Sequence, residues 1–449
     1  MSKYKYIVQD YHAIKKAEIT IDGITVLSGI NGCGKSTLSR WLYYLINGAN
    51  EFESYLFDDY QKKILYLTER MLFACIDLKR ASLQNKLQEK DSLDKLYDIV
   101  ESLKSIKHYS KEQIEIAQSL FIQALYTTRN FLTEALTEDT PSARKSRSLS
   151  YLHIQVHDKD THQAIENFIE KNSRWIDKLN NKFYQDMEQR PVQTFFESIN
   201  NHFNLNGDSP SFIQLKEDHV DIIEDNHIST LFNLRNAIYI DTPMAITAGS
   251  TDNFFWEALR KMIIDEKDKE QPVETKKFLL RIKGLLNGEV ALDKEDTFNE
   301  KKLHYVSNDN KINIGLSEVA TGFKTFSYLQ RLLENGYLNN ETLLMIDEPE
   351  AHLHPQWIVE FARLLVLLNK KLGLKIMIAS HNPDMVAAIH DIARKEEVLE
   401  DTNFYVAQPE NQDSHTYIYK DLGHDIGEIF ESFNIALENI NRYGAMDLQ

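Results

Sequence analysis

Residues 24–36, ITVLSGINGCGKS, decide the fold of this chain. Within this stretch, residues 29–36 match the pattern G-x-x-x-x-G-K-[ST] at every fixed position. An apolar run at 24–27 precedes the pattern and predicts a strand, and the apolar residues of 36–46 recur at helical spacing. A strand, a glycine-rich loop and a helix in this order predict a loop that binds phosphate groups.

The residues of this loop have distinct expected roles. Glycines let the backbone bend so that its N–H groups surround the phosphates, and the helix N-terminus adds partial positive charge. Lys35 is expected to reach the β- and γ-phosphates, and the Ser36 hydroxyl is expected to bind Mg²⁺. The alternative, a glycine-rich turn with a chance lysine, leaves the strand before it and the helix after it unexplained. The predicted phosphate-binding residues are Gly29, Asn31, Gly32, Gly34, Lys35, Ser36 and Thr37.

Two acidic residues follow a second apolar strand. The run at 343–346 (LLMI) ends in Asp347 and Glu348. At the carboxyl end of a strand, Asp347 would hold Mg²⁺ through water, and Glu348 would polarise the attacking water. Solvated carboxylates are the alternative for an isolated Asp-Glu pair, and the phosphate loop upstream argues against it. Asp347 is therefore a predicted metal residue and Glu348 a predicted catalytic base.

A histidine follows the next predicted strand, because residues 375–380 (KIMIAS) lead directly into His381. In a parallel sheet, a side chain at the carboxyl end of a strand points into the ligand crevice. There His381 would sense the γ-phosphate and position water, although a lone histidine is more often structural or solvated. His381 is the second predicted catalytic residue.

A further anion site is expected at residues 320–324 (ATGFK), which precede an amphipathic helix. A hydroxyl and a glycine at the start of a helix favour a bound anion. One molecule does not need a second phosphate cradle, so Thr321, Gly322 and Lys324 are predicted to close on a nucleotide held by another copy of the chain.

Taken together, GINGCGKST, ATGFK, LLMIDEPEAHLHP and IASHNP resemble the ATP-binding-cassette ATPases of the RecF/SMC and overcoming-lysogenization-defect (OLD) type. This resemblance covers residues 1–48 and 235–400, and it implies sandwich dimers with composite active sites. Residues 321–324 take the place of the family signature, whose commoner form is Leu-Ser-Gly-Gly-Gln. His354 falls where many relatives carry the D-loop aspartate, and His381 falls on the switch histidine. The run from ATGFK to HLHPQW most resembles the ATPase subunits of bacterial antiphage systems such as Septu and retron-associated modules.

Two functional positions of the family are not assigned by the motifs. The Q-loop glutamine, which couples the nucleotide to the inserted domain, has Gln155 and Gln214 as candidates. For the adenine contact, Tyr11 and His12 lie in a strand-to-strand turn, and an exposed turn is the alternative.

The fold class predicted from these patterns is α/β. We expect an ABC-type ATPase head, with a mostly parallel sheet flanked by helices and antiparallel strands at the N-terminus, plus a large, mainly helical insertion. Residues 141–150 are predicted to be a polar basic loop, and 421–440 a helix that packs on the core or docks a partner. The predicted divisions are 1–48 (head, N-terminal lobe), 49–235 (helical insertion), 236–400 (signature, acidic strand end and switch histidine) and 401–449 (strand and helix tail).

Composition narrows the functional classes. The chain has 449 residues and a net charge of −17, which argues against a surface that coats nucleic acid or anionic membrane. Two cysteines leave no disulfide framework or cysteine-rich zinc site, and no apolar run is long enough to span a bilayer. We therefore expect a cytoplasmic protein without a membrane partner. Arg144, Lys145 and Arg147 keep a DNA contact open, against the alternative of a solvated loop.

The sequence thus predicts an enzyme, a Mg²⁺-dependent ATPase whose ATP-bound homodimer, or higher homo-oligomer, gates a separate effector protein. The resemblance suggests antiphage defence and a nuclease as the effector, because the chain itself shows no nuclease motif. The alternatives are a RecF/SMC-like DNA-binding ATPase in repair, or a nucleotide-stabilised scaffold with little hydrolysis.

Overall fold

The computed structural model describes two compact units. The first, called the sheet unit, comprises Met1–Asn50 and Gly207–Gln449, and the second, the helical unit, comprises Glu51–Asn206. The residues that the structure describes are 2–79, 87–107, 109–136, 142–154, 161–205, 207–241, 254–265, 271–293, 302–351, 353–411 and 414–430.

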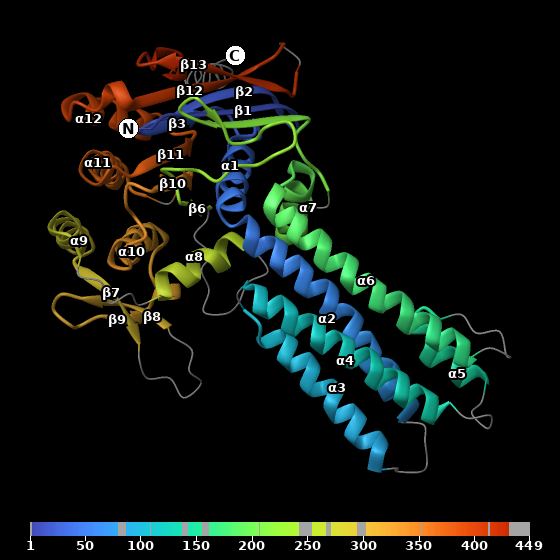
Figure 1. Ribbon diagram of the computed structural model, residues 1–449. Coiled ribbons are helices and arrows are strands. Elements are labelled where there is room, and N and C mark those ends of the chain that lie inside the picture. Colours follow the sequence, from blue (N-terminus) through green and yellow to red (C-terminus); the bar gives the residue numbers. More distant parts are fainter. Residues whose placement is uncertain are drawn as a thin grey trace, which may run out of the picture. The chain divides into compact units, whose positions relative to one another are not determined.

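A ten-stranded sheet forms the centre of the sheet unit (Figure 1). In spatial order its strands are β5 (Val220–Asp221), β4 (Phe212–Glu217), β1 (Tyr4–Tyr11), β2 (Ile14–Ile21), β13 (Tyr417–Gly423), β12 (Thr402–Pro409), β3 (Ile24–Ser28), β11 (Lys375–Ser380), β10 (Thr342–Asp347) and β6 (Asn236–Ile240).

The five strands from β12 to β6 are parallel, and the pairs β1–β2, β1–β4 and β4–β5 are antiparallel. This confirms the predicted fold class, a mostly parallel α/β sheet with antiparallel strands at the N-terminus. Ser28 pairs with Ser380, and Asp347 pairs with Ala379. The carboxyl ends of β3, β11 and β10 therefore meet at one edge, where a ligand is expected in an open α/β sheet.

Strands β3, β10 and β11 are buried along their whole length. A parallel sheet of this kind requires helices on its faces. The helices of the sheet unit include α1 (Lys35–Asn50), α10 (Thr321–Glu334), α11 (Pro355–Leu372) and α12 (Pro383–Lys395).

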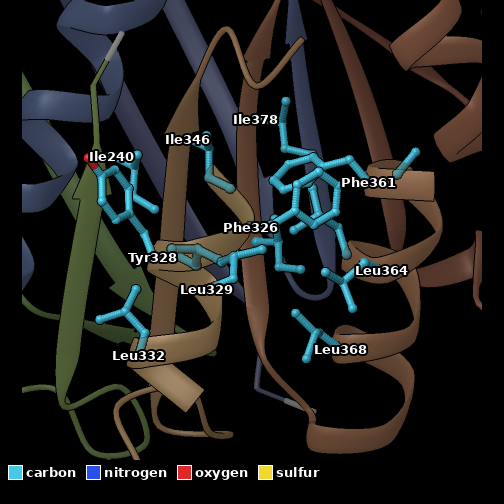
Figure 2. Packing of buried hydrophobic residues seen from close by; sticks show 14 of the residues in the cluster. Ile240, Phe326, Tyr328, Leu329, Leu332, Ile346, Phe361, Leu364, Leu368 and Ile378 are labelled. Carbon is cyan, nitrogen blue, oxygen red and sulfur yellow. The ribbon is translucent and has the colours of Figure 1, made fainter. Parts of the chain in front are cut away.

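Figure 2 shows how α10 and α11 pack beside the strands: Phe326 of α10 lies close to Phe361 of α11, near Ile346 and Ile378. The rings of Phe326 and Phe361 meet edge to face, with centroids 5.1 Å apart. Truncating a buried phenylalanine to alanine typically costs about 3–5 kcal/mol, so this cluster holds the two helices firmly on β10 and β11.

A small antiparallel sheet also belongs to the sheet unit. It consists of β7 (Gly288–Asp293), β8 (Lys302–Ser307) and β9 (Asn313–Gly315), with helices α8 (Phe254–Ile264) and α9 (Val273–Leu286) nearby in sequence. Gln330 of α10 accepts a hydrogen bond from the Val290 N–H at 3.1 Å and donates one to the Val290 carbonyl at 3.2 Å. Helix α10 is therefore fixed to both sheets.

The helical unit contains long helices packed side by side (Figure 1). Leu93, Leu96, Val100 and Leu103 recur at helical spacing and are buried, with Leu96 fully enclosed. The helices are α2 (Phe52–Lys79), α3 (Leu87–Ser105), α4 (Lys111–Ala135), α5 (Ser142–Ser150), α6 (Thr161–Gln189) and α7 (Val192–Phe203).

The prediction of a loop at 141–150 was wrong, because Ser142–Ser150 form helix α5. Leu149 is buried, and the Ser148 hydroxyl donates to Asp77 Oδ2 at 2.7 Å. This docking on α2 stabilises a helix whose serine-rich sequence has little intrinsic helix preference. The side chain of Arg144 lies outside the described residues.

The sheet unit is larger than the predicted head. The expected helical insertion ended at residue 235, whereas the helical unit ends at Asn206. The difference arises because β4 pairs with β1 along its whole length. In the predicted tail, β12 pairs with β3 in the middle of the sheet, and Ile429 is buried in the core. The helix predicted at 421–440 was wrong at its start, because Asp421–Gly423 belong to strand β13, which pairs with β12. Residues 431–440 lie outside the described residues.

No helix in the described part of the chain is long and apolar enough to cross a membrane.

Candidate functional site

The glycine-rich loop connects β3 to α1, as predicted. Gly34 has φ +97°, and a Cβ added there would lie 2.7 Å from Ile14 Cγ1. Gly32 also has positive φ, at +85°, with open space beside it. Only glycine adopts this path without strain, so the turn before α1 depends on these two positions. Asn31 and Gly32 are exposed, and Thr37 follows in the first turn of α1.

Lys35, the first residue of α1, is buried within this loop. Its ammonium group donates hydrogen bonds to the carbonyls of Gly29 at 2.8 Å and Ile30 at 3.0 Å. The Lys35 residue is only 7% exposed. Its positive charge is therefore held inside the loop, where backbone N–H groups and the N-terminus of α1 also favour an anion.

The two predicted metal residues, Ser36 and Asp347, lie in hydrogen-bonding contact across the ends of α1 and β10. The Asp347 carboxylate also accepts hydrogen bonds from Ser39 Oγ at 3.2 Å and from the Tyr239 hydroxyl at 2.7 Å. Burial raises the pKa of Asp347, while the three hydroxyl donors act in the opposite direction.

This donor set fits Mg²⁺, which prefers oxygen ligands and usually takes only one or two from the protein, with phosphates and water completing the shell. Among the described residues, no group of three or more His, Cys, Asp or Glu side chains is arranged to hold a metal. The Ser36 hydroxyl and the Asp347 carboxylate would supply two oxygen ligands to Mg²⁺ and leave the rest of its shell to phosphate and water.

A second layer of side chains supports Asp347. The Tyr239 hydroxyl, on β6, lies 3.3 Å from Asp241 Oδ1, and Arg40 Nη2 of α1 donates to Asp241 Oδ2 at 2.9 Å. The Arg40 guanidinium also lies 5.9 Å from the centroid of the Tyr239 ring. The sequence did not single out these three residues, because their proximity depends on β6 lying next to β10.

Glu348 adopts a backbone conformation that is unusual for a residue with a side chain, at φ +46°. Its N–H donates to the Ala379 carbonyl at 2.7 Å, which holds the strained turn against β11. The carboxylate oxygen Oε1 lies 3.3 Å from Nδ1 of His381. The structure therefore brings together the two residues predicted to be catalytic, from the ends of neighbouring strands.

Glu350 is a residue of this site that the sequence interpretation missed. It is 6% exposed, and its Oε1 accepts hydrogen bonds from Ser380 Oγ at 2.8 Å and from the His381 N–H at 3.2 Å. Burial raises the pKa of Glu350. A second glutamate in the run DEPE, two residues after Glu348, was the available signal.

The predicted signature residues lie at the start of α10. Lys324 Nζ donates to the carbonyl of Ser317, seven residues earlier in the chain, at 2.9 Å. Gly322 is in the first turn of the helix, and nothing is described of the Thr321 side chain. His354, at the predicted D-loop position, caps α11, since its Nδ1 accepts the Gln356 N–H at 3.4 Å.

Tyr11 and His12 form a stacked pair in the turn between β1 and β2, with ring centroids 4.1 Å apart and planes 15° apart. The rings of Trp41 and Tyr11 are nearly perpendicular, with centroids 5.8 Å apart, and His12 Nε2 lies 2.6 Å from Asp208 Oδ2. A stacked aromatic surface of this kind suits a planar base.

Of the two Q-loop candidates, Gln214 lies on β4 and donates to Asp221 Oδ1 at 2.8 Å. Gln155 lies outside the described residues.

The strand order and the phosphate loop define a nucleotide-binding α/β protein of the phosphate-loop class. A family described as an AAA ATPase domain matches residues 4–386, and the chain belongs to this family. The match agrees with the resemblance to ATP-binding-cassette ATPases that the motifs indicated.

Two curated relatives match shorter segments. The Old nuclease of Escherichia phage P2 is 30% identical over 95 residues, which cover 21% of this chain and 16% of that protein. The energy-coupling factor transporter ATP-binding protein EcfA3 of Clostridium perfringens is 38% identical over 72 residues, covering 16% of this chain and 25% of that protein. The chain therefore spans a quarter or less of the length of these relatives.

Solved structures with a loose likeness are heads of SMC proteins. An Smc head domain with an extended coiled coil, bound to the C-terminal domain of ScpA and derived from Pyrococcus furiosus, is 11% identical, with a TM-score of 0.34. That alignment covers 98% of this chain and 100% of the other. The SMC head domain from Thermotoga maritima is 10% identical, with a TM-score of 0.33, over 94% of this chain and 99% of the other. The family assignment depends on the match in sequence, not on these superpositions.

Proposed function

We propose that this protein binds ATP at the carboxyl ends of β3, β10 and β11 and hydrolyses its terminal phosphoanhydride. Membership of an ATPase-domain family supports this function. The geometry supports it as well, because a phosphate loop, a buried aspartate and a glutamate–histidine pair all lie at the same edge of the sheet.

Binding of the nucleotide would use the loop between β3 and α1. Its backbone N–H groups and the Lys35 ammonium bind the phosphate oxygens, and Ser36 and Asp347 hold Mg²⁺. When bound, Mg²⁺ neutralises negative charge on the β- and γ-phosphate oxygens. The aromatic pair of Tyr11 and His12 offers a surface for the adenine ring.

Hydrolysis would use the two residues beyond the strand ends. Glu348 accepts a proton from water, and the water oxygen forms a bond to the γ-phosphorus as the bond from that phosphorus to the bridging oxygen breaks. The products are ADP and inorganic phosphate. His381 donates a hydrogen bond to the γ-phosphate region and orients the water beside Glu348.

The single observation that carries this proposal is the 3.3 Å approach of Glu348 to His381, next to the contact between Ser36 and Asp347. The test compares wild-type protein with Glu348→Gln, a substitution of equal size. We expect turnover to fall by about 100-fold or more while ATP binding, measured by calorimetry, stays within a few-fold. Turnover equal to that of the wild type would remove Glu348 from its proposed role.

The active form is proposed to be a homodimer in which Thr321, Gly322 and Lys324 of one copy close on the nucleotide of the other. The position of Gly322 at the start of α10, with free amide groups expected in a first helical turn, supports this role. The solution mass of Glu348→Gln, saturated with Mg²⁺ and ATP, is expected to double relative to the nucleotide-free protein. Single subunits under both conditions would contradict the composite site.

The biological role is proposed to be the gating of a separate effector, with a nuclease in antiphage defence as the leading candidate. The segment shared with a phage nuclease supports this direction. If a nuclease gene adjoins this one, its product should cleave DNA in an ATP-dependent manner when combined with the wild-type protein. ATP turnover that rises strongly with duplex DNA alone would favour instead a DNA-repair ATPase.

A further inference from the structure

Glu350 is a buried carboxyl group that the proposed reaction does not use. Its side chain is only 4% exposed, and Oε2 has no hydrogen-bond partner among the described residues. A buried, partly unsatisfied carboxyl group costs free energy, so its presence beside a reactive site calls for a physical explanation.

The hydrogen bonds of Glu350 connect two loops. The Ser380 hydroxyl that donates to Glu350 also accepts the N–H of Asn382 at 3.1 Å, and the Asn382 side chain accepts the N–H of Asp384 at 2.8 Å. A continuous chain of hydrogen bonds thus runs from Glu350 to the first turn of α12.

The His381 ring lies near the carboxylates of both Glu348 and Glu350. Its ring nitrogen Nδ1 lies 3.3 Å from Oε1 of Glu348 and 3.7 Å from Oε1 of Glu350. Its backbone N–H is bound by Glu350, while the backbone of Glu348 is bound to β11 through Ala379. The first bond connects the end of β11 to the turn after β10, and the second connects the end of β10 to β11, so together they link the two segments that carry Glu348 and His381.

We infer that Glu350 is a positioning residue, which sets the place of His381 relative to the catalytic base Glu348 and contacts neither the nucleotide nor the attacking water. This inference rests on the proposed ATPase function of the same site. The acceptor oxygen of Glu350, rather than its bulk, does the positioning, since that oxygen receives both hydrogen bonds.

The test uses the full-length chain and three variants. Glu350→Ala removes the acceptor and should lower kcat between about tenfold and 100-fold, because small displacements of catalytic groups have effects of this size. ATP affinity should stay within about twofold, since no phosphate-binding residue is touched. Glu350→Gln keeps an acceptor oxygen and should retain kcat within about threefold of the wild type. The surface substitution Glu396→Gln, at the other end of α12, is the matched control.

A second arm asks whether Glu350 acts through His381. In a His381→Ala background, measured by single-turnover hydrolysis, Glu350→Ala should have little further effect, because the group it positions is gone. If Glu350→Ala lowers the rate of hydrolysis equally in the wild-type and the His381→Ala backgrounds, the inference is overturned. It is also overturned by a fall in ATP affinity that matches the fall in kcat, or by a Glu350→Gln variant as damaged as Glu350→Ala.

Two further outcomes remain decisive. If Glu350→Ala does not fold, Ser380→Ala removes one of the two hydrogen bonds and should lower kcat several-fold at unchanged ATP affinity; unchanged kcat would overturn the inference. If the wild type does not hydrolyse ATP, or Glu348→Gln matches it, the proposed function itself fails. If Glu348→Gln is slow and the Glu350 variants match the wild type, only the positioning role fails.

Discussion

Some buried polar side chains of the helical unit bond within their own helix, whereas those at the carboxyl ends of β10 and β11 in the sheet unit bond between segments. In the helical unit, Thr68 Oγ1 donates to the Ile64 carbonyl and Asn172 Nδ2 donates to the Phe168 carbonyl, each one turn earlier in its own helix. Such bonds satisfy a buried group locally and place no demand on the rest of the fold.

At the carboxyl ends of β10 and β11, the bonds of Asp347 and Glu350 instead connect residues of separate segments. Tyr239 donates to Asp347, and Ser380 donates to Glu350, from separate strands or loops. Long-range networks of buried charge are costly unless every member is placed correctly. Two buried carboxyl groups held in this way, Asp347 and Glu350, lie at the same edge of the sheet, which indicates that this edge is shaped for chemistry.

Among substitutions that test whether chemistry is confined to this edge of the sheet unit, Lys35→Ala is expected to have the largest effect. The substitution removes the charge held inside the phosphate loop, so ATP affinity should fall at least about 100-fold and turnover should become undetectable. Calorimetry with Mg²⁺ and ATP measures the affinity. Lys370→Ala, on the surface of α11, should bind ATP normally, and undiminished binding by Lys35→Ala would refute the loop assignment.

A somewhat smaller effect is expected from His381→Ala. Without the imidazole beside Glu348, kcat should fall about tenfold to 100-fold while ATP affinity changes little, because the loop and the metal residues remain. Steady-state hydrolysis at saturating ATP measures this. His424→Ala changes an exposed histidine of the same unit and should hydrolyse at the wild-type rate, and equal rates for both variants would place His381 outside the reaction.

The sequence predicted the parts of this edge that are contiguous in the chain. The phosphate loop is a single run of residues, and the alternation of strands and helices placed Asp347 and His381 at strand ends. Neighbours contributed by other strands left no local signal. Tyr239 contacts Asp347 only because β6 pairs with β10.

The same limitation applied to the fold. β12 forms a central strand beside β3 although almost 380 residues separate them, and β4 joins β1 after the entire helical unit. Strand pairing over such separations depends on the three-dimensional arrangement of side chains and not on local periodicity. Helix α5 was not predicted for a related reason: it is supported by a contact between Ser148 and Asp77 on α2, which the local sequence does not show.

The role of Tyr239 can be tested by removing a single hydroxyl. Tyr239→Phe deprives the buried Asp347 carboxylate of its 2.7 Å donor, so the Mg²⁺ concentration that gives half-maximal turnover should rise about tenfold. Maximal turnover at high Mg²⁺ should be largely restored. Tyr337→Phe removes a comparable bond to Asp265 away from the site and should leave the Mg²⁺ dependence unchanged. The same Mg²⁺ dependence in both variants would mean that the Tyr239 hydroxyl has only a structural role.

The smallest expected effect lies in the helical unit, where a buried carboxyl group serves no chemistry. Burial holds the pKa of Asp186 on α6 above its ordinary value, with a hydrogen bond from Thr194 acting in the opposite direction. As pH rises, the unfolded chain loses this proton before the folded chain does, so wild-type stability declines through the interval between the two pKa values and stays lowered above it. Asp186→Asn should therefore raise the unfolding midpoint by about 1 to 2 °C at pH 7 and leave it unchanged at pH 3. Circular dichroism melts at both pH values measure the difference, with the exposed Asp177→Asn on the same helix as control. ATP turnover should be unaffected, and a loss of turnover in Asp186→Asn would show that the helical unit contributes buried charge to the reaction after all.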